Sequence, residues 1–278
     1  MQDEADRLLL ERARAGDGQA IETLLERHQA QVYRFGMKMC RDPEDAKDVL
    51  QDTLLAMARS VRDFRGASSI STWLYTIARS FCIKKRRRSK FAPDEERSLD
   101  TDTAAEAKQL ADPAKSPDEA LAGKRVEHAL EQAIRSLEPM YREVLLLRDV
   151  EGLTAPEVAE VLGVSAQAVK SRLHRARLSV RAQVAPLLGI PAEAAASAAG
   201  TCPDVLTLFS QHLEDEISAD ICAEMERHLQ TCDRCRGTCD SLKHTLALCR
   251  TAGPLVQVPT SVQASVRVAL RNFLAENA

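Results

Sequence analysis

Residues 90–120 of this 278-residue chain carry many acidic side chains and three prolines but almost no large apolar side chains. A segment of that composition cannot bury a hydrophobic core, which favours a flexible acidic linker. One core therefore cannot organise the whole chain, and its length suits two or three domains. Residues 186–200, rich in alanine, glycine and serine, predict a second linker. The expected units are residues 1–89, 121–185 and 201–278.

Apolar residues recur at helical spacing on both sides of these linkers, so the expected fold class is all-α. We expect two small helical domains joined by the flexible linker, followed by a small helical C-terminal domain. Four helices are predicted before residue 88, and Asp42 with Pro43 is typical of a helix start. Residues 261–278 predict an amphipathic helix of moderate strength within the last unit.

Charge and cysteine content limit the function classes. The formal net charge is −3, but basic residues concentrate in two runs, 84–90 and 170–181, which favours contact with phosphates. The charged N-terminus predicts neither a signal peptide nor a membrane span, so the expected location is the cytoplasm. Thiols stay reduced there, and the eight cysteines are therefore more typical of ligands or sensors than of disulfides.

Residues 154–177 have the pattern of a helix-turn-helix. Gly163 stands at the predicted turn, and Ser165 is the predicted N-cap of the second helix. Polar and basic side chains on the outer face of that helix are of the types that contact base edges and phosphates. The outward-facing residues are Ala166, Gln167, Lys170, Ser171, His174 and Arg175.

The stretch LEPMYREVLLLRDVEGLTAPEVAEVLGVSAQAVKSRLHRARLSVR resembles region 4 of the extracytoplasmic-function (ECF) sigma factors of bacterial RNA polymerase. DPEDAKDVLQDTLLAMARSVRDFRG resembles their region 2.2, and SSISTWLYTIARSFCIKKRRR resembles regions 2.3 and 2.4. The resemblance implies a non-enzymatic protein that directs core RNA polymerase to specific promoter DNA. It also implies a helical region 2 that docks on the polymerase and a region 4 that binds the upstream promoter element.

The same resemblance assigns candidate residues. Asp48, Gln51 and Asp52 match the helix that docks on the polymerase, and their i, i+3, i+4 spacing puts them on one face. Trp73 is similar to the family's tryptophan, but a lone tryptophan in a helical domain is more often a core residue, and we expect it in the core. The candidate DNA-binding residues of region 2 are Arg65, Ser68, Ser69, Ser71, Arg79, Lys84, Lys85 and Arg86. Those of region 4 are Ser165, Ala166, Gln167, Lys170, Ser171, Arg172, His174 and Arg175.

The last unit contains an H-x3-C-x2-C pattern formed by His228, Cys232 and Cys235. On one continuous helix these residues would share about 60° of arc, at about 100° per residue. Thiolate and imidazole ligands suit tetrahedral zinc, and a closed site needs a fourth ligand. The segment resembles the zinc-binding anti-sigma domain, which makes Cys202 the first choice. Cys239, four residues beyond Cys235, remains an alternative.

The remaining metal-capable groups of this unit are Cys222, Cys239, His244 and Cys249. They motivate the hypothesis that the tail senses thiol oxidation or a thiophilic metal, with copper or cadmium as candidate signals beside zinc. A fused anti-sigma-like module would then contact its sigma domains within one chain. Both inhibition and activation of the sigma domains fit such a module. The alternative is a static fold that is stabilised by structural zinc and whose other cysteines have no sensing role.

Two other function classes compete with a sigma factor. A helix-turn-helix repressor or activator with a metal-responsive tail would bind duplex DNA without binding core polymerase. A thiol oxidoreductase would use the Cys232-x-x-Cys235 pair, but the surrounding sequence lacks the βαβ pattern of such enzymes. The sequence contains neither a phosphate-cradling glycine loop nor a nucleophile elbow, and we expect no enzyme activity.

Overall fold

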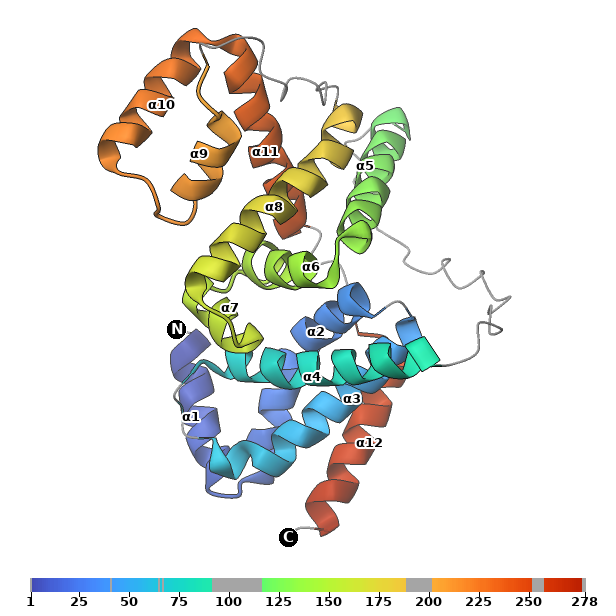
Figure 1. Cartoon of the computed structure of the whole chain (residues 1–278). Coiled ribbons are helices and arrows are strands. Elements are labelled where there is room, and N and C mark those ends of the chain that lie inside the picture. The colour runs from blue at the N-terminus through green and yellow to red at the C-terminus, as the bar shows by residue number, and fades with distance from the viewer. Residues whose placement is uncertain are drawn as a thin grey trace.

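The computed structural model describes residues 2–40, 42–64, 66, 68–91, 117–188, 202–251 and 258–276. All regular elements in these ranges are helices, as the sequence predicts (Figure 1). Most of the two expected linkers, 90–120 and 186–200, lies outside the described residues. None of the described helices is both long and apolar enough to cross a lipid bilayer.

The first group of helices comprises α1 (Gln2–Arg14), α2 (Gly18–Met39), α3 (Pro43–Ser60), η1 (Val61–Asp63) and α4 (Ile70–Phe91). Local sequence explains where they begin: the Asp17 carboxylate accepts hydrogen bonds from the first backbone N–H groups of α2. Asp42 caps α3 in the same way, with Pro43 at its first position. Phe35, Leu50 and Leu74 lie in the shared core of α2, α3 and α4.

The second group comprises α5 (Pro117–Ser136), α6 (Pro139–Leu145), η2 (Leu146–Val150), α7 (Ala155–Leu162), α8 (Ala166–Val184) and η3 (Ala185–Leu188). Helices α7 and α8 form the predicted helix-turn-helix. Gly163 ends α7 in a left-handed conformation with φ of 65°, which a residue without a Cβ adopts at low cost. The Ser165 hydroxyl accepts a hydrogen bond from the Ala168 N–H and starts α8.

The third group comprises α9 (Val205–His212), α10 (Ala219–Thr231) and α11 (Asp233–Thr251). These helices share a small apolar cluster that includes Phe209, Met225 and Leu242. Helix α11 runs along α8 and joins the third group to the second (Figure 1).

Helix α12 (Thr260–Glu276) is the predicted C-terminal amphipathic helix. From the sequence we expected this helix to belong to the unit of residues 201–278. In the structure it lies apart from α9–α11 and packs against α3 and α2 (Figure 1). The polypeptide therefore returns to its first group of helices near its end.

The first and second groups also contact each other. Helix α4 packs on α7, and Glu151, which follows η2, accepts hydrogen bonds from Arg34 and from the Tyr75 hydroxyl, each at 2.7 Å. Burial, followed by the nearby Glu151 carboxylate, raises the pKa of Tyr75 well above its usual value. Arg79 on α4 donates to Glu143 on α6 at 2.9 Å. The helices on either side of the acidic segment are thus held together.

Candidate metal centre and nucleic-acid interface

Cys202, His228, Cys232 and Cys235 come together at the end of α10 and the start of α11. Their ligand atoms all lie within 4.8 Å of one another. Three sulfur atoms and one imidazole nitrogen are a donor set typical of closed structural zinc sites. This is the ligand set expected from the sequence, with Cys202 in the fourth position.

The polar atoms of this cluster fit a cation. The Nε2 atom of His228 is buried and has no hydrogen-bond partner, which is costly unless a metal occupies its lone pair. The backbone N–H of Cys235, followed by the Cys235 thiol, lowers the pKa of Cys232 and favours its thiolate form. Thiolate is the form that binds metals.

The geometry differs from the single helix assumed for His228, Cys232 and Cys235. Helix α10 ends at Thr231, and Cys232 adopts an extended conformation between α10 and α11, so one continuous helical arc was the wrong expectation. The reason is local: the break turns the chain, which lets Cys235 on α11 face His228 on α10. Cys239, one turn further along α11, lies in the apolar core of α9–α11 instead of in the cluster.

The other candidate sensor residues do not gather in one place. Cys249 is fully buried where α11 meets the other helices, and burial raises the pKa of its thiol to about 12. His244 is exposed on α11. Cys222 is half-buried on α10, with its sulfur 3.6 Å from the Nδ1 atom of His212. Among the candidate sensor thiols that the structure describes, Cys222 is the accessible one.

The predicted DNA-reading helix α8 is partly covered by the third group of helices. Lys170 donates to the backbone carbonyl of Glu214 at 2.8 Å and lies 3.6 Å from the Glu216 carboxylate. The Nε2 atom of His174 lies 3.5 Å from the Thr207 hydroxyl. Gln167, Ser171 and Arg175 are exposed, Ser165 is the exposed cap, and Ala166 and Arg172 are half-buried.

Glu214, in the turn after α9, is the centre of the contact with the second group. Its carboxylate binds Arg177 at 2.7 Å and Arg148 at 3.1 Å, and its side chain is almost fully buried. Arg177 is also held by Asp149 through two hydrogen bonds of 2.9 and 2.7 Å. We call these residues, Glu214, Arg148, Arg177 and Asp149, the carboxylate clasp. A buried charge is tolerated only when paired, and these pairs join the turn after α9 to η2 and α8.

Several candidate DNA-binding residues of region 2 already have protein partners. Arg79 pairs with Glu143, and Lys85 pairs with Asp48 and Asp45. The side chains of Lys84 and Arg86 are exposed. At the start of α4, the hydroxyls of Ser69 and Thr72 are hydrogen-bonded to each other. The Ser71 hydroxyl accepts a hydrogen bond from the side-chain amide of Gln31. Ser68 is half-buried. Arg65 lies outside the described residues.

Trp73, expected in the core, is half-buried and packs against it. Its ring stacks on Phe64, with ring centroids 4.5 Å apart.

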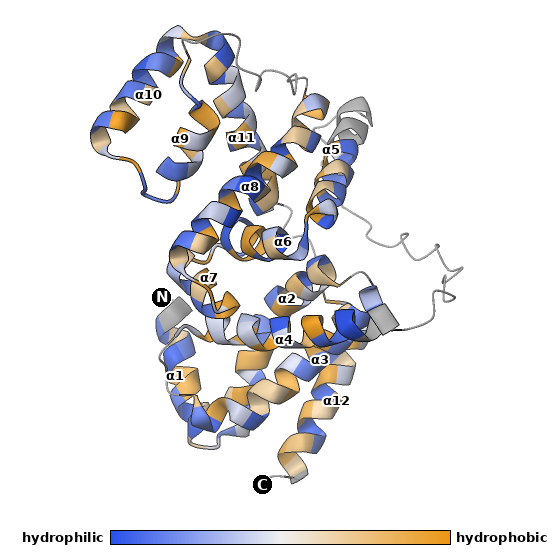
Figure 2. Ribbon diagram, viewed as in Figure 1, coloured by the Kyte–Doolittle hydropathy of each residue, from blue (hydrophilic) through white to orange (hydrophobic). Residues whose placement is uncertain are grey.

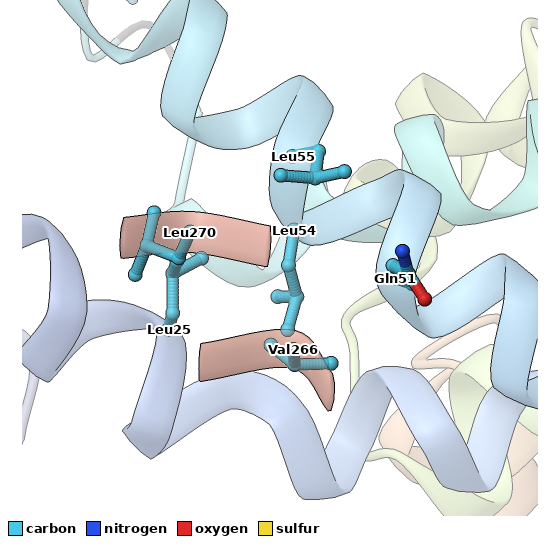
Figure 3. Close-up of a pocket in the computed structure, with 6 residues that line it drawn as sticks. All are labelled: Leu25, Gln51, Leu54, Leu55, Val266 and Leu270. Carbon is cyan, nitrogen blue, oxygen red and sulfur yellow. The ribbon is translucent and has the colours of Figure 1, made fainter. Parts of the chain in front are cut away.

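The predicted polymerase-docking residues lie along α3, next to α12. Asp48 and Asp52 are exposed, and Gln51 is half-buried. Figure 3 shows Gln51 in the same small pocket as Leu54 and Leu55 of α3, Leu25 of α2, and Val266 and Leu270 of α12. Helix α12 therefore lies directly beside the predicted docking face.

Helix α12 is attached by an apolar stripe and an ion pair. Val262, Val266 and Leu270, spaced four residues apart, are buried. Figure 2 shows apolar bands along α12. Arg267 pairs with Glu26 of α2 at 2.9 Å. The apolar stripe could be read from the sequence, but the helix it packs against could not.

Comparisons with known proteins agree with this arrangement of segments. The sigma-70 region 2 model matches residues 24–91, the sigma-70 region 4 model matches residues 127–180, and a zinc-finger family model matches residues 202–236. The chain is 30% identical over 189 residues to the RNA polymerase sigma-H factor of Pseudomonas aeruginosa, covering 66% of this chain and 96% of that one. It is 32% identical over 175 residues to the ECF RNA polymerase sigma factor SigM of Mycobacterium tuberculosis, covering 63% of this chain and 80% of SigM.

A solved structure of CnrH in complex with the cytosolic domain of CnrY is 28% identical, with a TM-score of 0.45, covering 64% of this chain and 96% of that chain. The sequence matches to regions 2 and 4 identify this chain as a member of the ECF sigma factors of the sigma-70 family. A zinc-finger, anti-sigma-like segment is fused behind its region 4.

Proposed function

We propose that this chain directs bacterial core RNA polymerase to promoters and that its residues 202–276 restrain it in cis. The sigma role follows from family membership. The observation that carries the restraint is the position of α12, which packs on α3 beside Gln51, a residue matched to the polymerase-docking helix. Asp48 and Asp52 are exposed, so α12 would obstruct polymerase on the Gln51 side of that face. The tail is thus an inhibitor in this proposal.

The region 4 side of the restraint rests on the turn after α9. Glu214 and Glu216 are acidic groups against Lys170, Arg148 and Arg177. DNA phosphates would compete for Lys170, because cations on a reading helix bind phosphate oxygens. The turn therefore blocks DNA at α8 while α12 blocks polymerase at α3.

Contact between regions 2 and 4 adds a third restraint. Arg79, a candidate for contact with the melted DNA strand, is paired with Glu143 of region 4. A chain bound to DNA through Arg79 would have to give up that pair. Since all three restraints lie within one polypeptide, no second inhibitor molecule is needed, and the effective concentration of the tail is high.

Removing the tail tests the proposal. A version ending at Leu188 should bind purified core polymerase at least tenfold more tightly than the full chain, because α3 would lose its cover. Binding can be measured by fluorescence anisotropy with labelled sigma factor. Equal affinity would contradict inhibition, weaker binding by the short version would mean that the tail activates, and no binding by either would favour the repressor class.

We further propose that zinc occupies the cluster of Cys202, His228, Cys232 and Cys235 and fixes the junction of α10 with α11. The bound ion would hold the four side chains and supply folding free energy, as structural zinc does in small domains.

Replacing a ligand should remove the ion. We expect about one tightly held zinc per chain, and His228→Ala should lose it and lower the melting temperature of the α9–α11 group. The zinc content of the purified protein after dialysis against a weak chelator is the measurement. His244→Ala, an exposed histidine of the same unit, is the control and should retain the zinc. Equal zinc in both variants would rule out His228 as a ligand.

A further inference from the structure

A second group of metal-capable side chains lies at the other end of α10 from the Cys202 cluster. The Sγ atom of Cys222 is 3.6 Å from the Nδ1 atom of His212 and 3.9 Å from the Oε1 atom of Glu226. These separations are close to those between neighbouring ligands on one tetrahedral ion with metal–ligand bonds of about 2.0–2.3 Å. We propose that His212, Cys222 and Glu226 form a second metal site, for a borderline divalent cation such as Zn²⁺ or Cd²⁺.

The helices explain why these three residues meet. Cys222 and Glu226 are four residues apart on α10 and therefore share a face of that helix. His212 is the last residue of α9, which packs against α10. Two elements thus supply the ligands, and the positions of their backbones are fixed by the packing of α9 on α10.

The donor set suits a borderline cation. A thiolate and a carboxylate supply two negative charges, and the neutral imidazole supplies none, so a divalent ion would be neutralised. Binding would release the Cys222 thiol proton to solvent. Sulfur favours the softer divalent ions over Mg²⁺ or Ca²⁺, which prefer all-oxygen sites.

The second site differs from the Cys202 cluster in being open. His212 and Glu226 are exposed, and Cys222 is half-buried. Among the described residues, the Cys202 cluster is the group whose ligand atoms all lie within 4.8 Å of one another. The second site would be completed on binding, by rotation of the exposed Glu226 side chain, with water as a fourth ligand. An open, exposed site exchanges its ion more readily than a closed one.

The second metal site lies beside the turn through which the third group of helices contacts the second group. His212 and Cys222 stand on either side of the turn that carries Glu214, the residue of the carboxylate clasp contributed by the third group. An ion on both residues would hold the two ends of that turn together. It would also favour the conformation in which Glu214 binds Arg148 and Arg177, since that is where the ligands converge. This regulatory consequence rests on the proposed function, whereas the metal site itself does not.

The test is a titration of the zinc-loaded full-length chain with Cd²⁺, followed by desalting and metal analysis. The native chain should take up one more metal ion than the Cys222→Ser variant, while both keep the ion of the Cys202 cluster. His212→Ala and Glu226→Gln should weaken the additional binding at least tenfold. The matched controls are His244→Ala and Glu224→Gln, exposed residues of the same unit outside the site, which should bind as the native chain does.

Hydrogen exchange locates the ion. Cd²⁺ should slow exchange of the backbone amides of residues 212–222 in the native chain and leave it unchanged in Cys222→Ser. The proposal is overturned if the native chain takes up no additional ion, if Cys222→Ser takes up as much as the native chain, or if exchange in residues 212–222 does not respond. None of these measurements involves polymerase, so they remain informative even if the tail proves not to inhibit.

Discussion

The variant Leu270→Asp should bind core RNA polymerase at least tenfold more tightly than the native chain. Leu270 is 2% exposed and lies in the pocket shared by α12, α2 and α3, next to Leu25 and Leu54. An aspartate there would be a buried charge among apolar side chains, which costs several kcal/mol and should detach α12. A tenfold gain in affinity corresponds to about 1.4 kcal/mol of lost restraint.

The control for this variant is Val268→Asp on the same helix. Val268 is 58% exposed, so an aspartate there adds the same charge to α12 without disturbing its packing. It should bind polymerase as the native chain does. Circular dichroism of both variants should remain that of a helical protein, because α12 lies at the edge of the first group. If Leu270→Asp and Val268→Asp bind equally, α12 does not cover the docking face.

Replacing Glu214 with glutamine should release α8 and strengthen binding to duplex DNA. The glutamine keeps the shape of the side chain but loses the charge that holds Arg148 and Arg177. Asp149 still pairs with Arg177, so the change weakens the attachment of the turn by less than the about 3–5 kcal/mol of an ion pair that loses its only partner. Lys170 and Arg148 would then be available to phosphates. Each additional phosphate contact steepens the dependence of log affinity on log salt by about 0.9.

The measurement is the affinity of the full chain for a labelled duplex at several salt concentrations. The variant Glu214→Gln should bind several-fold more tightly at low salt, with a slope steeper by about 1 to 2. Asp215→Asn is a charge-matched control, because it also removes one negative charge but from an exposed position. A similar gain in both variants would point to net charge alone and would argue against the carboxylate clasp.

Local features of the fold were accessible from the sequence because they depend on neighbouring residues. Gly163 and Ser165 define the turn and start of the reading helix through backbone conformation and one capping hydrogen bond. The stripe of Val262, Val266 and Leu270 predicts an amphipathic helix by spacing alone. The H-x3-C-x2-C pattern predicts three of the residues that come together, whereas Cys202 was chosen over Cys239 from the resemblance to the anti-sigma domain.

Contacts between distant segments were not accessible in the same way. Glu214 is one acidic residue among several in its turn, and only the packing of α9 against α8 makes it a buried partner of Arg177. The burial of Arg177 could not be predicted from the sequence either, because arginines on a helix-turn-helix usually lie on an outward basic face. The break after Thr231 could not be predicted, because the cysteine spacing also fits an unbroken helix.

The order of segments along the chain has a consequence for a newly made protein. The predicted docking helix α3 ends at Ser60, and α12, which packs against it, begins at Thr260, about 200 residues later. At a synthesis rate of about 5–20 residues per second, α3 is made roughly 10–40 s before synthesis of α12 begins. In the proposed restraint, a nascent chain would lack the obstruction by α12 during that interval. The proposed restraint would therefore act only after α12 has been made and has packed on α3.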